Sequence, residues 1–359
     1  YQNFERLDVA FQGIVPEHVL YTLEAGREAA ERNGSPVLVW LGRNEIPVMV
    51  AATGVKNGYR YSFDTGLDGE TWFISNSDDP LQWNIMVSVK SLTFALYGYQ
   101  GVKDKIYALL DNIYAEGYGE NNELPKEAIS RIDYCFDFKA DYFEISLNNF
   151  IFHSRCKKKY LYSKEIISAE RKIIAAIIGS IPNRQIVLCD KILEIQENNK
   201  SYWWKIWGID KEEFNQKICR VEIRAGKKEL KTFNLRTFDD LENKIGDVIA
   251  SILKEIKYIA PDLNNENPIN QPLSPFWKKS QNSVKNIFSE YIPNAKINSV
   301  IKEYTNLLIE QYKEKISDML PACIAALGKE EAAHIPGVLE GYLQQVSGSP
   351  RKNKFKIQK

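Results

Sequence analysis

Two strand-like stretches of this sequence alternate charged with apolar side chains. They are residues 131–138 (Arg-Ile-Asp-Tyr-Cys-Phe-Asp-Phe) and 219–224 (Cys-Arg-Val-Glu-Ile-Arg). Because successive side chains of an extended chain point to opposite faces, the charged residues of each stretch share one face. These are Arg131, Asp133 and Asp137 in the first stretch, and Arg220, Glu222 and Arg224 in the second. Carboxylates beside arginines can hold a divalent cation and a phosphodiester together, and they can equally form a salt-bridged outer face.

A third stretch, residues 184–194, places charge at the end of an apolar run. Asp190 and Lys191 end the run, and Glu194 follows within one helical turn. Acidic ligands from three strands would form an oxygen-rich site suited to Mg²⁺ or Mn²⁺, with Lys191 and Arg224 neutralising a phosphate. The acidic candidates are Asp133 or Asp137, Asp190 or Glu194, and Glu222. The alternative is that Asp190 with Lys191, and Glu222 with its flanking arginines, are structural ion pairs.

Basic and aromatic residues in the middle of the chain are candidates for contacts with nucleic acid. The formal net charge is zero, but residues 151–236 carry about 19 basic and 10 acidic side chains, whereas residues 1–130 carry about 10 and 18. A polyanion would therefore bind the middle of the chain, although a solvated basic face is the alternative. Trp203 and Trp204 could stack on bases or could plug the core. The other candidates in this region are His153, Arg155, Lys157, Lys158, Lys159, Lys227 and Lys228. His153 could ligate a metal or touch a phosphate, and a structural hydrogen bond is its alternative role.

Several functional classes are excluded by what the sequence lacks. It has no glycine-rich phosphate loop, no zinc signature and no serine-hydrolase elbow. Its three histidines do not form the metal-binding pair of some nucleases. No apolar run approaches the roughly 20 residues that a bilayer requires. With no signal peptide before Tyr1 and five cysteines that form no C-x-x-C pair, we expect a cytoplasmic protein with reduced thiols and no membrane contact.

The elements that must position these residues follow from periodicity and turn signals. Residues 17–33 are predicted to form an amphipathic helix that stops at Gly34. Short β-branched or aromatic runs then predict an antiparallel meander, and residues 83–97 are predicted to extend it as a strand. The runs of the meander are 37–41, 46–53, 59–64 and 71–75. Residues 102–115 have helical spacing, and 131–138 is the predicted central strand.

A second β-rich part follows, with strands predicted at 149–154, 184–191 and 218–225 and a helix at 237–258. The expected fold class is α+β, a largely antiparallel sheet flanked by helices and followed by a helical C-terminal region. We expect one domain over residues 1–260, with β-rich halves at about 1–140 and 141–260. A linker at 261–280, a helical region at 281–346 and a disordered basic tail at 347–359 should follow.

The stretches 131–138, 185–194 and 220–224, in this order, resemble the replication initiation factor family, which includes rolling-circle plasmid initiators and relaxases of conjugative elements. The resemblance spans about residues 7 to 260. It implies binding of partly single-stranded origin DNA, and a metal-assisted attack by a tyrosine that nicks one strand. By motif position it implies acidic ligands at Asp133, Asp190, Glu194 and Glu222. It also implies phosphate contacts at Lys191, Arg220 and Arg224, and the expected metal is Mg²⁺ or Mn²⁺.

The sequence departs from the family where the nucleophile is expected. Family members carry a tyrosine shortly after the glutamate-containing strand, but residues 226–233 contain none. Tyr258 is the next tyrosine along the chain, and Tyr160, Tyr162 and Tyr202 are further candidates. Two alternatives therefore stay open: a noncatalytic DNA-binding or regulatory protein on the same scaffold, and a protein-interaction module that uses the helical tail. A helicase partner and a homodimer are further expectations.

Overall fold

The computed structural model describes residues 1–55, 58–114, 125–152, 158–162, 173–260, 271–288 and 296–327. At 158–162 and 316–327 it describes the backbone alone. Among the described residues, no helix combines the length and the apolar composition needed to cross a lipid bilayer.

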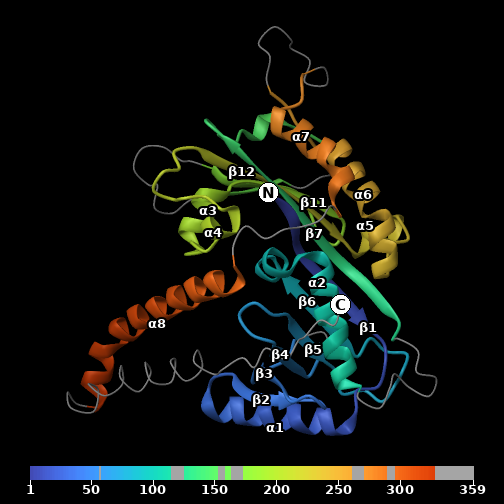
Figure 1. Cartoon of the computed structure of the whole chain (residues 1–359), viewed down its shortest axis with the longest axis vertical. Helices are drawn as coiled ribbons and strands as arrows, with labels where there is room; N and C mark the ends of the chain where they lie inside the picture. Colours follow the sequence, from blue (N-terminus) through green and yellow to red (C-terminus); the bar gives the residue numbers. More distant parts are fainter. Residues whose placement is uncertain are drawn as a thin grey trace.

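The chain builds one 11-stranded sheet in the order β2-β3-β4-β5-β6-β1-β7-β12-β11-β10-β9 (Figure 1). Every pair of neighbouring strands in it is antiparallel. The N-terminal strands are β1 (Gln2–Phe11), β2 (Val37–Leu41), β3 (Ile46–Val50), β4 (Tyr61–Asp64), β5 (Thr71–Ile74) and β6 (Ile85–Lys90). The others are β7 (Glu127–Ala140), β9 (Lys158–Tyr162), β10 (Ile173–Gly179), β11 (Arg184–Asp190) and β12 (Lys217–Gly226). A separate pair joins β8 (Phe150–Ile151) to β13 (Lys257–Tyr258).

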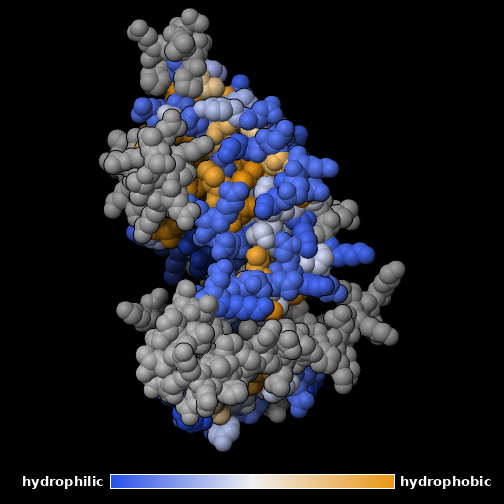
Figure 2. Space-filling view, turned by 90° about the vertical axis from the view of Figure 1, so that its left-hand side faces the viewer, coloured by the Kyte–Doolittle hydropathy of each residue, from blue (hydrophilic) through white to orange (hydrophobic). Residues whose placement is uncertain are grey.

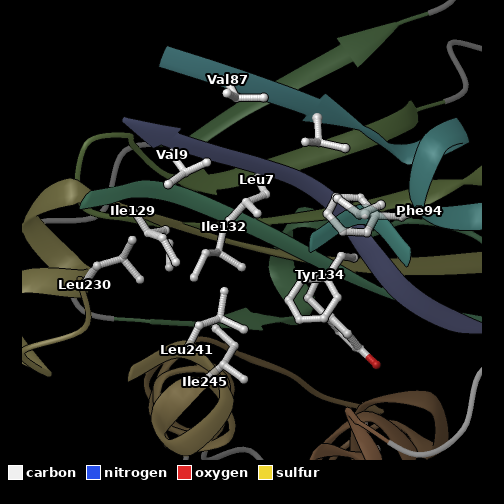
Figure 3. Packing of buried hydrophobic residues seen from close by; sticks show 14 of the residues in the cluster. Leu7, Val9, Val87, Phe94, Ile129, Ile132, Tyr134, Leu230, Leu241 and Ile245 are labelled. Atoms are coloured by element: carbon white, nitrogen blue, oxygen red, sulfur yellow. The ribbon is translucent and has the colours of Figure 1, made fainter. Parts of the chain in front are cut away.

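One face of this sheet carries the main hydrophobic core. It is covered by α1 (Glu17–Asn33), α2 (Ser91–Ile113), α5 (Lys227–Thr232), α6 (Phe238–Glu255) and α7 (Pro275–Ser283). Figure 3 shows Ile132 and Tyr134 of β7 on this face, above Leu241 and Ile245 of α6. The helix α6 begins with a capping box in which Thr237 and Asp240 satisfy each other's backbone N–H groups, which explains why the helix starts there.

The opposite face of the sheet is partly covered by α3 (Lys191–Glu197), α4 (Trp203–Trp207) and the start of α8 (Ile297–Leu327). Their apolar side chains form a second cluster in which Trp203 of α4 and Val300 of α8 are fully buried. Figure 1 shows the rest of α8 running away from the sheet. Among the coloured residues in the upper half of Figure 2, hydrophilic side chains surround an apolar patch.

The fold class expected from the sequence is confirmed, because a large antiparallel sheet with flanking helices leads into the helices α7, η3 (Val284–Asn286) and α8. The two β-rich halves share this one sheet. The prediction that residues 131–138 form a central strand is also confirmed, since β7 lies between β1 and β12.

Two expected elements differ in the structure. Residues 83–97 were expected to form one strand, but the strand ends at Lys90 and α2 begins at Ser91. Residues 92–96, at the start of this helix, are all buried. The expected linker at 261–280 runs into α7, whose Trp277 is fully buried in the main core.

Candidate functional site

Charged side chains from three neighbouring strands lie in register on the sheet face opposite the main core. Arg6 of β1 pairs in register with Asp133 of β7, and Asp133 pairs with Arg224 of β12. One step along the strands, Asp8 pairs with Arg131. We call this set the arginine–carboxylate lattice: Arg6, Asp8, Arg131, Asp133, Glu222 and Arg224.

Each arginine of the lattice binds the carboxylate two residues away on its own strand. Arg131 donates two hydrogen bonds to Asp133, from Nε at 2.9 Å and from Nη2 at 2.7 Å. Arg224 Nε lies 2.6 Å from Glu222 Oε1 and 3.8 Å from Asp133 Oδ2. Arg6 Nε lies 2.9 Å from Asp8, which also accepts a hydrogen bond from Ser88. Two residues apart on a strand is the spacing that puts both partners on one face.

The cations of the lattice are more exposed than its carboxylates. The side chains of Arg131 and Arg224 are 22% and 25% exposed, whereas those of Asp133 and Glu222 are 4% and 13% exposed. Lys90 of β6, in register with Arg6, is exposed as well. A ligand that approaches this face therefore meets guanidinium and ammonium groups first.

Burial also changes the proton affinity of the lattice carboxylates. Burial raises the pKa of Asp133 to about 6, against the hydrogen bonds from Arg131, and the nearby charge of Glu222 adds to the rise. Burial alone would also raise the pKa of Glu222. The positive charge of Arg224 outweighs the effect of burial, so the pKa of Glu222 is lowered. When this pair takes up a proton, the proton therefore resides on Asp133.

Beside the lattice, the same sheet face carries a second set of charges that is covered. Arg220 is 1% exposed and lies 2.6 Å from Asp137 and 2.9 Å from Glu5. Trp203 of α4 stacks over the Arg220 guanidinium at 4.5 Å. Trp207 of α4 donates its indole N–H to Asp137 at 2.9 Å. We call Glu5, Asp137 and Arg220 with these two tryptophans the covered network.

The acids at the end of β11 have separate partners. Asp190 accepts backbone N–H groups at the start of α3 as its N-cap, and its other oxygen lies 3.2 Å from Lys217. Glu194 forms ion pairs with Lys191 and, at 3.0 Å, with Lys200. Lys191 is buried, with its ammonium 5.0 Å from the Trp203 ring.

The four predicted metal ligands Asp133, Asp190, Glu194 and Glu222 are therefore not brought together. Asp133 and Glu222 meet in the lattice, whereas Asp190 and Glu194 are held at α3 by lysines and backbone N–H groups. Within the part of the chain that the structure describes, no three His, Cys, Asp or Glu side chains form a group that could hold a metal ion. The four residues do not fit one divalent cation, and we assign no chemical step to such an ion.

The predicted base-stacking residues Trp203 and Trp204 are buried in the cluster beneath α8. They act as core residues here, which is the alternative role that the sequence left open. Lys227 and Lys228 are exposed at the start of α5, directly after Gly226, which pairs in register with Arg131. Lys158 and Lys159 lie on β9, at the far edge of the sheet, and their side chains are not described. His153, Arg155 and Lys157 lie outside the described residues.

Tyr258, the first candidate for a nucleophile, lies on the other side of the sheet. Its ring packs in the main core against Phe150 and Phe276, and its hydroxyl accepts the backbone N–H of Ser146 at 3.0 Å. Burial raises its pKa, which opposes formation of a phenolate. Tyr202 is buried too, with its ring against Tyr304 of α8. No contact among the described residues brings the hydroxyl of Tyr258 or of Tyr202 to the lattice.

Sequence reasoning missed the residues that β1 and β6 contribute to this face. Arg6, Asp8 and Lys90 complete the lattice side of the sheet, and Glu5 completes the covered network. A signal was present, because Arg6 and Asp8 repeat the two-residue spacing of Arg131 and Asp133 within an alternating stretch. That β1 would pair with β7 could not be read from this spacing.

Comparison with solved structures found similar chains, whereas the two comparisons of the sequence found none. No protein-family model matches the sequence, and no curated protein matches it. A solved structure described as "Structure of Rolling Circle Replication Initiator Protein from Geobacillus stearothermophilus" is similar with a TM-score of 0.41 and 13% sequence identity. The similarity covers 80% of this chain and 97% of that chain.

Proposed function

We propose that this protein is a DNA-binding protein of the replication-initiator kind, and that the arginine–carboxylate lattice binds the sugar-phosphate backbone of origin DNA. The observation that carries the proposal is that Arg6 and Arg224 flank Asp133 in one row of the sheet, while Arg131 lies in the next row on the same face and Lys90 lies at the border. The order of the sequence stretches that resemble the replication initiation factor family supports the same assignment.

The geometry favours a phosphate-binding role over a purely structural ladder. Guanidinium groups present several N–H donors in a fixed plane, and part of each fork in the lattice remains exposed while its carboxylate is held beneath. Adjacent strands lie about 4.8 Å apart, so the three arginines span a distance over which a nucleic acid strand places successive phosphates. Neutralisation of phosphates by such cations provides most of the affinity in nonspecific DNA binding.

Nicking of the bound strand is the second candidate function, and one observation favours it. Asp133, with a pKa of about 6, lies between two arginines. A carboxyl group with such a pKa can accept or deliver a proton near neutral pH, as attack of a tyrosine hydroxyl on phosphorus and departure of the 3′-oxygen require. Tyr160 and Tyr162 of β9, whose side chains are not described, stay candidates for the nucleophile. Metal assistance by Mg²⁺ or Mn²⁺, a helicase partner, a homodimer and a cytoplasmic location stay predictions.

Binding can be tested with fluorescently labelled single-stranded and duplex oligonucleotides by anisotropy over a range of salt concentrations. The variant Arg131→Gln/Arg224→Gln should bind more weakly, with a salt dependence lower by about one phosphate contact per arginine removed. A matched control is Arg27→Gln/Arg32→Gln, because these arginines pair with glutamates on the outer surface of α1. Equal affinity of the lattice variant and the wild type would contradict the proposal.

The nicking candidate needs a separate measurement. The protein is incubated with supercoiled and single-stranded DNA in Mn²⁺, in Mg²⁺ or in chelator, and adducts that survive denaturant are sought. Loss of an adduct in Tyr160→Phe or Tyr162→Phe would identify the nucleophile, and dependence on metal would be read directly. DNA binding without any adduct would support the noncatalytic alternative.

A further inference from the structure

We propose that a cavity on the core side of the sheet, between α2, α6 and η3, binds a nucleobase that carries an exocyclic amino group. This inference is independent of DNA binding by the lattice, which lies on the opposite face of the sheet. The cavity has a volume of about 610 Å³. Small-molecule sites typically have volumes of roughly 300 to 1,000 Å³. Such sites combine aromatic walls with a few polar groups.

Aromatic side chains form part of the cavity wall, beside polar residues such as Asn3 and Gln100. Phe4, Tyr99, Tyr134 and Phe288 line it. Their rings meet at centroid distances of 5.0 to 6.0 Å, as in Phe4 with Tyr134 at 5.0 Å and Phe4 with Phe288 at 6.0 Å. Phe288 is 41% exposed, so it forms the solvent side of the cavity. Phe4 and Tyr134 are each 1% exposed, so Tyr99 and Phe288 provide the ring surface that a planar ligand can meet.

A break in α2 gives the cavity this shape. Gly98 has φ 65° and ψ −179° inside the helix, a conformation that is accessible essentially only to glycine. The helix therefore restarts after Gly98, and Tyr99 turns its ring onto Phe4 at 5.3 Å and onto Phe288 at 5.1 Å. Gly98 thus sets the direction of the second part of α2.

The polar groups of the cavity select the ligand. Glu242 of α6 lines it, and its Oε1 accepts hydrogen bonds from Tyr99 at 2.8 Å and Lys103 at 2.7 Å. Among the described residues no hydrogen bond is made to its Oε2, which is available to a donor. Lys103 and Tyr99 lower the pKa of Glu242 against the effect of burial, so the group is an acceptor at neutral pH. Gln2, whose Nε2 donates to the Asn286 carbonyl, adds an amide to the lining.

This combination matches an aminated nucleobase. Such a base has flat faces for the aromatic walls and in-plane N–H groups for a carboxylate, which is the pairing that glutamate makes with the cytosine amino group. A carboxylate disfavours an anion at the same place, so the base and not a phosphate is the recognised group. Guanine, cytosine and adenine carry the amino group, whereas thymine does not.

The test is titration of the full chain with guanosine, cytidine, adenosine and thymidine, followed by ligand-observed NMR. The amino-bearing nucleosides should bind more tightly than thymidine. Phe288→Ala should weaken binding about tenfold, as expected for loss of one stacking ring. Glu242→Gln leaves the aromatic side chains in place and should abolish the preference for amino-bearing nucleosides over thymidine. Tyr142→Ala, an exposed aromatic residue elsewhere, is the matched control and should bind as the wild type does.

A second arm distinguishes a free nucleoside from a base within a strand. If only oligonucleotides show an effect of Phe288→Ala, and an abasic oligonucleotide does not, the cavity takes a base of a nucleic acid strand. The lattice variant Arg131→Gln/Arg224→Gln should leave nucleoside binding unchanged, which separates this inference from the proposed function. Absence of any Phe288-dependent binding in both arms, or loss of nucleoside binding in the lattice variant, would overturn the inference.

Discussion

The lattice and the covered network use the same residue types on the same sheet face, yet their surroundings differ. In the covered network, Arg220 is fully buried between two carboxylates and beneath Trp203. In the lattice, Arg131 and Arg224 keep part of each guanidinium exposed. Burial of an ion pair leaves no room for a ligand and makes each partner indispensable to the other. Charge alternation on a strand therefore identifies a face, whereas the covering layer decides which part of that face can bind a ligand.

The largest expected effect comes from removing the cation of the covered network. Arg220→Met leaves Asp137 and Glu5 buried without their counter-ion, and the free energy of unfolding should fall by about 3 to 5 kcal/mol. Chemical denaturation measures this loss. The matched control is Arg6→Met in the lattice, whose side chain is 38% exposed. Its loss should be about 1 kcal/mol or less. Equal losses in the two variants would contradict the distinction between the two regions.

The pH dependence of stability provides a second test of the difference between the two regions, at a carboxylate of the lattice. The pKa of Asp133 is raised from 3.8 to about 6, so the folded protein holds a proton that the unfolded chain releases. The resulting stability is fully present below about pH 4 and is lost as the pH rises through 6. The groups that face Asp133 are Arg131, Arg224, Glu222 and, across the strand pair, Arg6.

Between pH 4 and pH 7.5, the free energy of unfolding of the wild type should therefore fall relative to Asp133→Asn, by on the order of 2 to 3 kcal/mol. Glu24→Gln is a control of opposite sign. Arg60 and Arg27 lower the pKa of Glu24, so the stability that its carboxylate contributes rises as the pH rises towards about 4.5 and stays constant above it. The same trend for both variants would show that Asp133 is not the group that holds the proton.

Much of the fold could be predicted from local signals, and the site only in part. The α1 helix, the meander and the central position of 131–138 follow from periodicity, because each depends on its own residues. Residues 83–97 were assigned wrongly, since their β-branched and aromatic content outweighed the helical spacing of Leu92, Ala95 and Leu96. The ion pairs of the lattice within one strand are visible as two-residue spacings, whereas the cover of α4 over Arg220 depends on contacts between distant segments.

The predicted ligand set failed to converge for the same reason. Asp190 and Glu194 are near Glu222 in strand order, but Asp190 caps α3 and Glu194 binds the lysines around it. A capping carboxylate at a strand end has the same sequence signature as a metal ligand, because both follow an apolar run. Only the direction of the next element distinguishes the two roles.

The smallest expected effect concerns Tyr258, which belongs to the core and not to the charged face. Tyr258→Phe removes the hydrogen bond from the Ser146 N–H at 3.0 Å, so the free energy of unfolding should fall by about 1 kcal/mol. Tyr142→Phe, at an exposed tyrosine, should change it negligibly. If the protein forms a covalent adduct with DNA, Tyr258→Phe should form it to the same extent, as measured in denaturing gels. Loss of the adduct without loss of stability would place Tyr258 at the reacting phosphate, and the sheet would no longer separate the core layer from the charged face.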